Sequence, residues 1–138
     1  MAFMLTAVDA DMHTVSFTNN CGYGTPNLVA ESGTLLSDGA PLTMNGPLIG
    51  AVAFLQTGNC GNDGEDCTTV NITLENGENS FTVNPPYGSS ISVKFYNGCD
   101  GLGVDCGVSG CSGPQPLGVS SFANCTAPNV DLEITFCD

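Results

Sequence analysis

The 138-residue sequence predicts an all-β protein, most simply a disulfide-stapled antiparallel β-sandwich. Three observations indicate this fold. Short runs alternate polar and apolar residues, clusters of Gly, Pro and Asn separate these runs, and eight cysteines are spread along the chain. No window of about a dozen residues has helical periodicity without a helix breaker in it.

Two kinds of apolar run predict the strands in the first half of the chain. Residues 13–19 alternate and place Val15 and Phe17 on one face. Residues 48–55 are almost continuously apolar, which is typical of a strand buried on both faces. Residues 69–74 alternate again, so they predict a third strand.

The second half of the chain predicts two more strands, at residues 91–95 and 130–136. In the last of these, alternate positions are apolar and share one face: Val130, Leu132, Ile134 and Phe136. The segments between the strands have turn composition, namely GTP (24–26), SDGAP (37–41), NGP (45–47), NPPYG (84–88) and SGPQP (112–116).

Length and composition predict one domain, at residues 13–138, because 41% hydrophobic residues suffice for one core and no internal repeat is present. Residues 1–12 contain a short apolar run, 2–8, but no positively charged residue before it, so they are not a complete signal peptide. We expect this segment to be the stub of a processed leader or an expression remnant. No apolar stretch approaches the roughly 20 residues that span a bilayer.

The charge is strongly one-sided, with fourteen Asp and Glu against one Lys and no Arg, a formal net charge of −13. Nucleic acids and anionic membranes both require clustered cations, which Lys94 alone does not provide. Unpaired carboxylates are costly to bury, so most of the acidic groups are expected in water, where they keep the protein soluble. We expect a monomer without a nucleic-acid partner, a membrane partner or a cofactor.

The eight cysteines predict a disulfide framework in an oxidising compartment, and hence a secreted, extracellular protein. Zinc sites usually have close cysteine pairs together with His, whereas here the only His precedes every cysteine. Eight cysteines allow 105 pairings, so spacing alone leaves the connectivity open. Two glycosylation triplets, at Asn71 and Asn124, agree with secretion, although Cys125 within the second can block it.

Several segments carry a resemblance to a known family. The stretch Phe17-Thr18-Asn19-Asn20-Cys21 resembles the opening of thaumatin-like proteins, and Thr57-Gly58-Asn59-Cys60 with Cys67 resembles their Thr-Gly-Asp-Cys segment and small disulfide loop. Residues 68–74 and 90–97 resemble later strands of the same family. The chain is shorter than typical members and has fewer cysteines, which implies the core β-sandwich without the second domain. The stretches NNCGYGTP, LQTGNC, FYNGCDG and ITFCD are also similar to small secreted cysteine-rich "glycopeptide" proteins of basidiomycete fungi.

The resemblance implies a pairing of the cysteines. The first should bond the last, Cys21 to Cys137, and Cys60 to Cys67 should close a small acidic hairpin. The remaining pairs are then expected to be Cys106–Cys111, whose short separation is easy to close, and Cys99–Cys125.

The resemblance does not imply catalytic residues in this chain. Larger members have an acidic cleft, with an Arg among Glu and Asp residues, that is associated with binding or cleaving β-1,3-glucan. Here no Arg exists, Asn59 replaces the Asp, Asn71 falls near the Glu position, and residues 90–96 supply Ser, Lys or aromatic residues instead of Asp. Hydrolysis needs two carboxyl groups roughly 5 to 10 Å apart. We predict no catalytic residue; a pair such as Glu75 with Glu133 keeps a β-1,3-glucanase as an alternative.

We predict no metal site, although two alternatives exist. His13 is expected as a surface or strand-start residue; it could chelate copper only if processing made it the amino terminus, and copper enzymes of that kind add a second His. The acidic loops at 62–66 and 100–105 offer oxygen ligands for calcium but lack the spacing of a calcium loop, so plain turns are preferred.

The candidate binding residues are three tyrosines and an amide: Tyr23, Tyr87, Tyr96 and Asn59. Tyr23 and Tyr87 are expected on loops, where an exposed ring can stack on a sugar. We therefore expect a secreted, non-enzymatic binding or defence-related protein that recognises a cell-wall polysaccharide of the β-glucan type. An immunomodulatory or structural surface protein is the further alternative.

Overall fold

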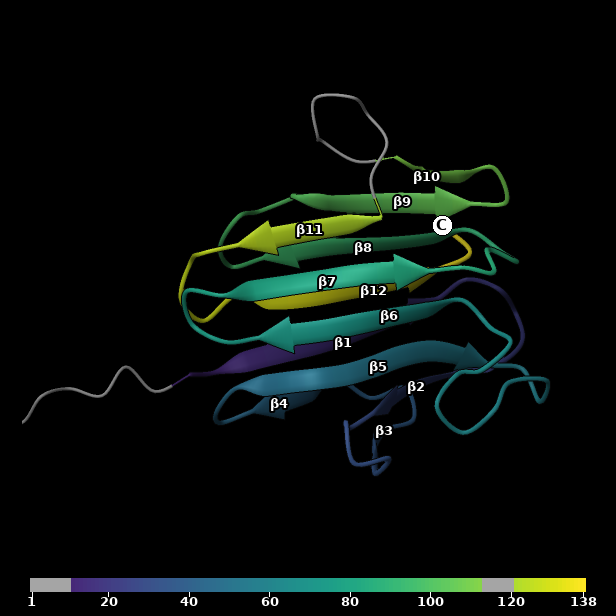
Figure 1. The fold of residues 1–138 in the computed structure, drawn as a ribbon, viewed down its shortest axis with the longest axis horizontal. Helices are drawn as coiled ribbons and strands as arrows, with labels where there is room; N and C mark the ends of the chain where they lie inside the picture. Colours follow the sequence, from purple (N-terminus) through teal and green to yellow (C-terminus); the bar gives the residue numbers. More distant parts are fainter. Residues whose placement is uncertain (1–10, 113–120) are drawn as a thin grey trace, which may run out of the picture.

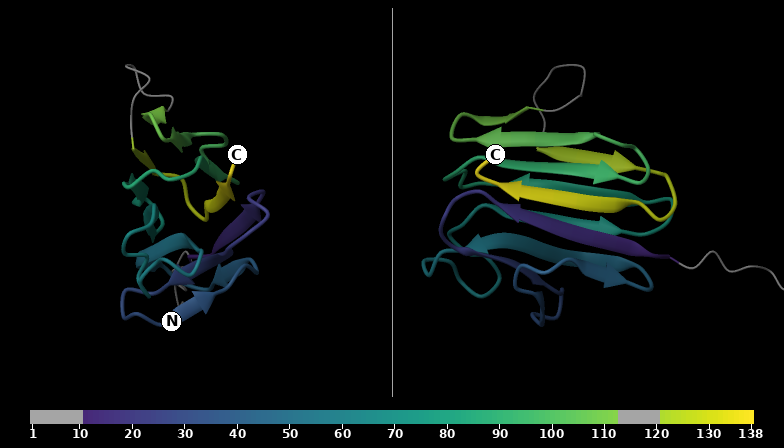
Figure 2. Two further views of the ribbon diagram at one scale, coloured as in Figure 1. Left: turned by 90° about the vertical axis from the view of Figure 1, so that its right-hand side faces the viewer. Right: turned by 180° about the vertical axis from the view of Figure 1, so that it is seen from behind.

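Twelve strands form two six-stranded sheets that lie face to face in the computed structural model, which describes residues 11–112 and 121–138 (Figures 1 and 2). Sheet A has the order β10 (Gly110–Ser112), β9 (Gly103–Gly107), β8 (Ile91–Tyr96), β12 (Asp131–Phe136), β1 (His13–Asn19) and β4 (Leu42–Met44). Sheet B has the order β11 (Phe122–Cys125), β7 (Asn79–Asn84), β6 (Thr69–Leu74), β5 (Leu48–Gln56), β2 (Thr25–Val29) and β3 (Leu35–Ser37). The prediction of an all-β, disulfide-stapled sandwich is confirmed.

The five predicted strands are all present, as β1, β5, β6, β8 and β12. One feature of their arrangement differs from the prediction, because the sandwich is not wholly antiparallel. β1 and β12 run parallel in the middle of sheet A, with Val15 opposite Leu132 and Asn19 opposite Phe136. All other strand pairs are antiparallel. The first and last strands of the sandwich are therefore neighbours.

The core lies between the sheets and consists of the inward residues of each alternating strand. Phe81 of β7 and Phe95 of β8 meet across it, with ring centroids 5.2 Å apart. Most of the remaining core residues are aliphatic: Val15, Leu28, Val70, Ile72, Leu74, Val83, Ile91, Val93, Leu132 and Ile134. No described residue belongs to a helix long and apolar enough to cross a membrane.

One local prediction is correct only in part, and another is wrong. β5 is buried on both faces toward its end, at Ala53, Phe54 and Leu55, whereas Ile49 near its start is 51% exposed on the outside of sheet B. The expected turn at 24–26 is the start of β2: Thr25 and Pro26 pair with Gln56 and Leu55. The turn expected at 112–116 lies outside the described residues, apart from Ser112 at the end of β10.

The four disulfides join the pairs that the resemblance implied. Cys21–Cys137 links the ends of β1 and β12, and Cys99–Cys125 links the loop after β8 to β11 of the other sheet. Cys106–Cys111 crosses the hairpin of β9 and β10. The fourth pair, Cys60–Cys67, lies within the irregular loop 57–68 that connects the antiparallel strands β5 and β6, so it closes the loop of this hairpin.

His13 is the first residue of β1, as the strand-start alternative predicts, but it is buried and not on the surface. It is 1% exposed at the start of β1, with Nδ1 2.6 Å from the carbonyl oxygen of Val130. Its Nε2 has no hydrogen-bond partner and lies 4.0 Å from the Asp11 carboxylate. Asp11 and Met12 also contact the sandwich, because their atoms bond to Asn76 and Asn129. The sequence could not reveal this burial, since the carbonyl that the imidazole contacts belongs to Val130, 117 positions away.

Charge is unevenly divided between the sheets. The strands of sheet B contain no charged residue, whereas those of sheet A contain Lys94, Asp105, Asp131 and Glu133. The Lys94 ammonium lies 3.7 Å from the Asp105 carboxylate, and both side chains are about half exposed.

Replacing Lys94 with Met should therefore change the free energy of unfolding by less than about 1 kcal/mol, because solvent screens an exposed pair. Urea unfolding of both proteins at neutral pH measures this difference. A loss of unfolding free energy several times larger would show that Lys94 stabilises the protein by offsetting the repulsion among all the acidic groups of sheet A, and not through Asp105 alone.

Candidate functional site

A cleft of about 380 Å³ opens at the end of the sandwich where β8 begins and β12 ends. Its apolar side comes from both sheets, with Leu55 from β5, Ile91 from β8 and Phe136 from β12. Three loops supply the rest of the lining, namely those that contain Tyr23, residues 57–68 and residues 86–89. The cleft therefore forms where segments far apart in the sequence meet.

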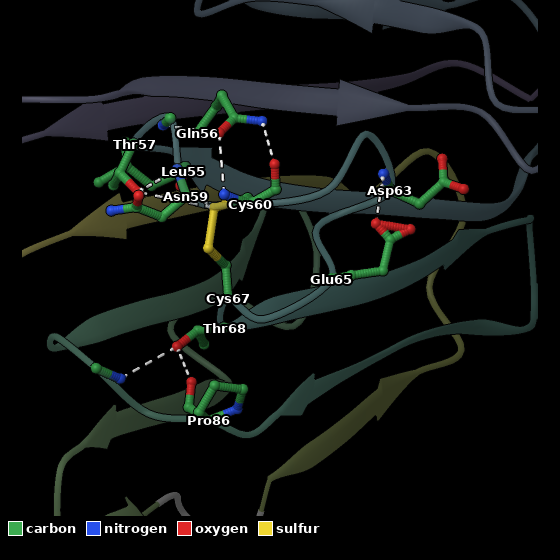
Figure 3. Close-up of a disulfide and its surroundings, with 12 residues drawn as sticks. Leu55, Gln56, Thr57, Asn59, Cys60, Asp63, Glu65, Cys67, Thr68 and Pro86 are labelled. Atoms are coloured by element: carbon green, nitrogen blue, oxygen red, sulfur yellow. Dashed lines mark hydrogen bonds between the residues drawn. A yellow bond between two sulfur atoms is a disulfide. The ribbon is translucent and has the colours of Figure 1, made fainter.

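The loop at residues 57–68 is held by its disulfide and by one side chain (Figure 3). The Gln56 amide accepts hydrogen bonds from the backbone N–H groups of Gly58 and Cys60, at 2.9 and 3.3 Å, and donates to the Cys60 carbonyl at 3.2 Å. Cys60–Cys67 then fixes the far end of the loop. Gly64 lies against the buried ring of Phe54, where a Cβ would come within 2.9 Å of Cδ1. The loop is thus fixed at both ends and packed on the sheet.

Thr68 joins this loop to the next one. Its hydroxyl donates to the carbonyl of Pro86 and accepts from the Gly88 N–H at 3.4 Å, as Figure 3 shows. The Pro85–Pro86 peptide bond is cis. Two of the three cleft loops therefore hold each other in place.

Asn19 organises the third loop. Its amide nitrogen donates to the carbonyls of Tyr23 and Gly24, at 3.0 and 3.2 Å, and its Oδ1 accepts from the Cys21 N–H at 3.0 Å. Cys21 is bonded in turn to Cys137, beside the end of β12. These contacts hold the backbone of Tyr23 while the residue as a whole remains 57% exposed.

The cleft brings together two of the four predicted binding residues, Tyr23 and Asn59. Tyr87 lies between two lining residues, but its ring packs on the core and its hydroxyl donates to the Val83 carbonyl at 3.4 Å. Tyr96 lies at the opposite end of β8, where its hydroxyl is 3.0 Å from the Ser16 hydroxyl. The tyrosines therefore do not form one platform.

Sequence reasoning missed the other polar groups of the cleft: the hydroxyls of Thr57, Thr68 and Ser89 and the carboxylate of Asp66. Thr57 and Thr68 flank the Cys60–Cys67 loop, so the disulfide pattern was the available signal for their proximity. No local pattern pointed to Ser89.

The chemistry of these groups suits hydrogen bonding more than proton transfer. Asp66 is the one carboxylate among the described lining residues, and that set contains no cation. A glycosidase needs an acid and a second carboxylate on opposite sides of the scissile bond. Neither Glu75 nor Glu133 lines this cleft: Glu75 follows β6 of sheet B, and Glu133 lies in β12 of sheet A, where it accepts a bond from Thr18.

The acidic loops have local roles in the structure. Asp100 accepts the Gly98 N–H at 2.8 Å, and Glu65 accepts the Asp63 N–H at 3.2 Å, as carboxylates in turns do. Within residues 11–112 and 121–138, no group of three or more His, Cys, Asp and Glu side chains could hold a metal ion.

Comparisons with known proteins give one structural similarity. No protein-family model matches the chain, and no curated protein sequence matches it. A solved structure of the thaumatin-like xylanase inhibitor TLXI superposes on 91% of this chain and 99% of its own, with 18% sequence identity and a TM-score of 0.49. At this sequence identity and TM-score, the similarity does not indicate a function for the chain.

Proposed function

We propose that the protein is a secreted, monomeric, non-enzymatic carbohydrate-binding protein of the defence type, whose end cleft binds a neutral polysaccharide. A β-glucan is the first ligand to test. The observation that carries the proposal is the exposed Tyr23 beside a cleft whose polar lining, apart from the Asp66 carboxylate, consists of neutral hydroxyl and amide groups. Aromatic rings stack on the apolar faces of sugars, while the polar neighbours bond to the sugar hydroxyls.

The polar lining favours a neutral ligand. Thr57 and Ser89 can both donate and accept, and so can the amide of Asn59, whereas Thr68 already donates its proton to Pro86 and can only accept. Sugar hydroxyls have the same dual character. An anionic polymer would meet Asp66 and a protein of formal charge −13, so it would be repelled.

The size and rigidity of the cleft support binding as well. About 380 Å³ lies in the usual range of ligand pockets, roughly 300 to 1,000 Å³. Two disulfides, Cys21–Cys137 and Cys60–Cys67, border the cleft, so little conformational entropy is lost when a ligand binds. Four disulfides among the described residues also support an oxidising, extracellular location.

Sedimentation with insoluble β-1,3-glucan, combined with a reducing-sugar assay on the supernatant, tests the proposal. Binding without sugar release is the expected result. Sugar release would favour the glucanase alternative, and absence of both would overturn the choice of ligand and favour an immunomodulatory or structural role.

Replacing Tyr23 with Ala should weaken glucan binding about tenfold, equivalent to ~1.4 kcal/mol, because the stacking surface is lost. Phe122→Ala is the matched control, since it removes another exposed ring from a strand outside the cleft. Binding isotherms for the three proteins measure the effect. Equal losses in both variants would contradict a specific role for Tyr23.

Replacing Asp66 with Asn distinguishes binding from catalysis. Asn accepts hydrogen bonds through its carbonyl and tolerates the positive φ of 69° at this position, so glucan affinity should change by no more than about threefold. The same isotherms measure it. If the cleft hydrolysed glucan, this substitution would abolish sugar release.

A further inference from the structure

The outer face of sheet B has no charge along any of its six strands, in a protein with fourteen carboxylates. Figure 1 shows the three strands on which the inference rests, β11, β7 and β6, side by side in one layer. Their outward positions hold hydroxyls, amides and one exposed ring: Thr69, Asn71, Thr73, Ser80, Thr82, Asn84, Phe122 and Asn124.

Both Asn-x-Thr triplets of the sequence lie on this face. Asn71 is exposed on β6 and Asn124 is exposed on β11, so the two amides flank β7. In each triplet the middle residue points inward: Ile72 is in the core, and Cys125 is buried and bonded to Cys99. The disulfide therefore lies on the opposite side of β11 from the Asn124 amide, so it does not cover the acceptor.

A neighbouring ring distinguishes the two acceptor sites. In a strand, residues two positions apart share a face, so Phe122 and Asn124 of β11 lie side by side, and Thr126, just beyond the strand, lines the same groove. Phe122 is 44% exposed and lines a groove of about 290 Å³ together with Ser80, Asn124 and Thr126. The corresponding position before Asn71 is Thr69, which offers no ring.

We propose that Asn71 and Asn124 carry N-linked glycans and that the first sugar on Asn124 packs against Phe122 in this groove. In the modification, the amide Nδ2 loses one proton to the transferring enzyme and forms a bond to the anomeric carbon of an oligosaccharide. The bond from that carbon to a polyprenyl pyrophosphate carrier breaks, and the pyrophosphate leaves with the carrier. The Phe122 ring then covers the apolar face of the attached sugar.

The glycan face is separate from the cleft of the proposed function. The groove lies along β11 and the β6–β7 turn, and it shares no lining residue with the cleft. Glycans on sheet B would leave the Tyr23 loop accessible. Glycosylation of sheet B and glucan binding in the cleft share only the requirement for secretion, so a protein that failed to bind glucan could still carry both glycans.

Secretion of the full chain from a eukaryotic host tests the modification. Intact mass before and after peptide-N-glycosidase treatment should reveal two glycans in the wild type, and one each in Asn71→Gln and Asn124→Gln. An unmodified wild-type mass in correctly disulfide-bonded secreted protein would overturn the proposal. A single glycan would overturn it for the unmodified site.

A double-mutant cycle tests the contact with Phe122. Removing the Asn124 glycan through Thr126→Ala should lower the Tm by roughly 2 to 5 °C when Phe122 is present, and by much less in the Phe122→Ala background. Asn71→Gln serves as the matched control, because its glycan should show no such dependence on Phe122. If Thr126→Ala lowered the Tm equally with and without Phe122, the proposed packing would be overturned. The same would follow if only the effect of Asn71→Gln depended on Phe122.

Discussion

Replacing Cys21 and Cys137 together with Ser should lower the free energy of unfolding by about 4 kcal/mol. The bond joins residues 116 positions apart, so its removal releases nearly the whole unfolded chain, and loops of this length are worth about 4 to 5 kcal/mol on the chain-entropy model. Denaturant unfolding under non-reducing conditions measures the loss.

The double replacement of Cys106 and Cys111 is the matched control. These residues are 5 positions apart, so the same model gives roughly 2 kcal/mol. If both variants lost equal stability, loop length would not determine the contribution of these disulfides.

Replacing Asn79 with Asp should cost about 3 to 5 kcal/mol at pH 8. Asn79 is 1% exposed, and its amide nitrogen donates to the carbonyls of Cys125 and Ala127 at 3.0 and 2.9 Å. An ionised carboxylate of the same shape would place a negative charge against both oxygens, without a donor and away from water.

The cost should fall at acidic pH. Burial and the two carbonyl dipoles raise the pKa of the introduced carboxyl in the folded state above its unfolded value. The protonated acid can still donate one bond, so stability is retained below the unfolded pKa and is lost as the pH rises through the folded pKa.

Unfolding at pH 4 and pH 8, each compared with the wild type at the same pH, measures this change. Asn20→Asp introduces the same charge at an exposed position and should cost about 0.5 kcal/mol or less at either pH. A loss for Asn79→Asp that did not depend on pH would contradict the role of ionisation.

The sequence predicted the strands whose pattern is long and regular. In β1, β6, β8 and β12, polar and apolar residues alternate because one face of each strand packs against the core. The inward residues Val15, Ile72, Val93 and Ile134 are buried, as this alternation predicts. The short strands β3, β4 and β10 have three residues each, too few for a period to be recognised. β7 was not predicted either, although its apolar residues Phe81 and Val83 alternate with polar ones, so the pattern of a strand was present in the sequence.

Sheet order and the cleft depend on contacts between distant segments. Loop composition predicted Tyr23, and the resemblance of residues 57–60 to a Thr-Gly-Asp-Cys segment pointed to Asn59. Ile91 and Phe136 became their neighbours only because the sheets pack with these ends together. The position of Tyr96 follows from the same packing, since it lies five residues along β8 from the cleft. Local sequence carries none of this information.

The parallel pairing of β1 with β12 implies an order of folding during synthesis. Neighbouring strands of sheet B from β2 to β7 are close in sequence, so they can pair as they leave the ribosome. Sheet A cannot close in the same way, because β12 lies between β1 and β8 and follows all the other described strands in the sequence. Until β12 is in place, β1 and β8 each have an open edge, so the folding chain is exposed to mispairing at the middle of sheet A.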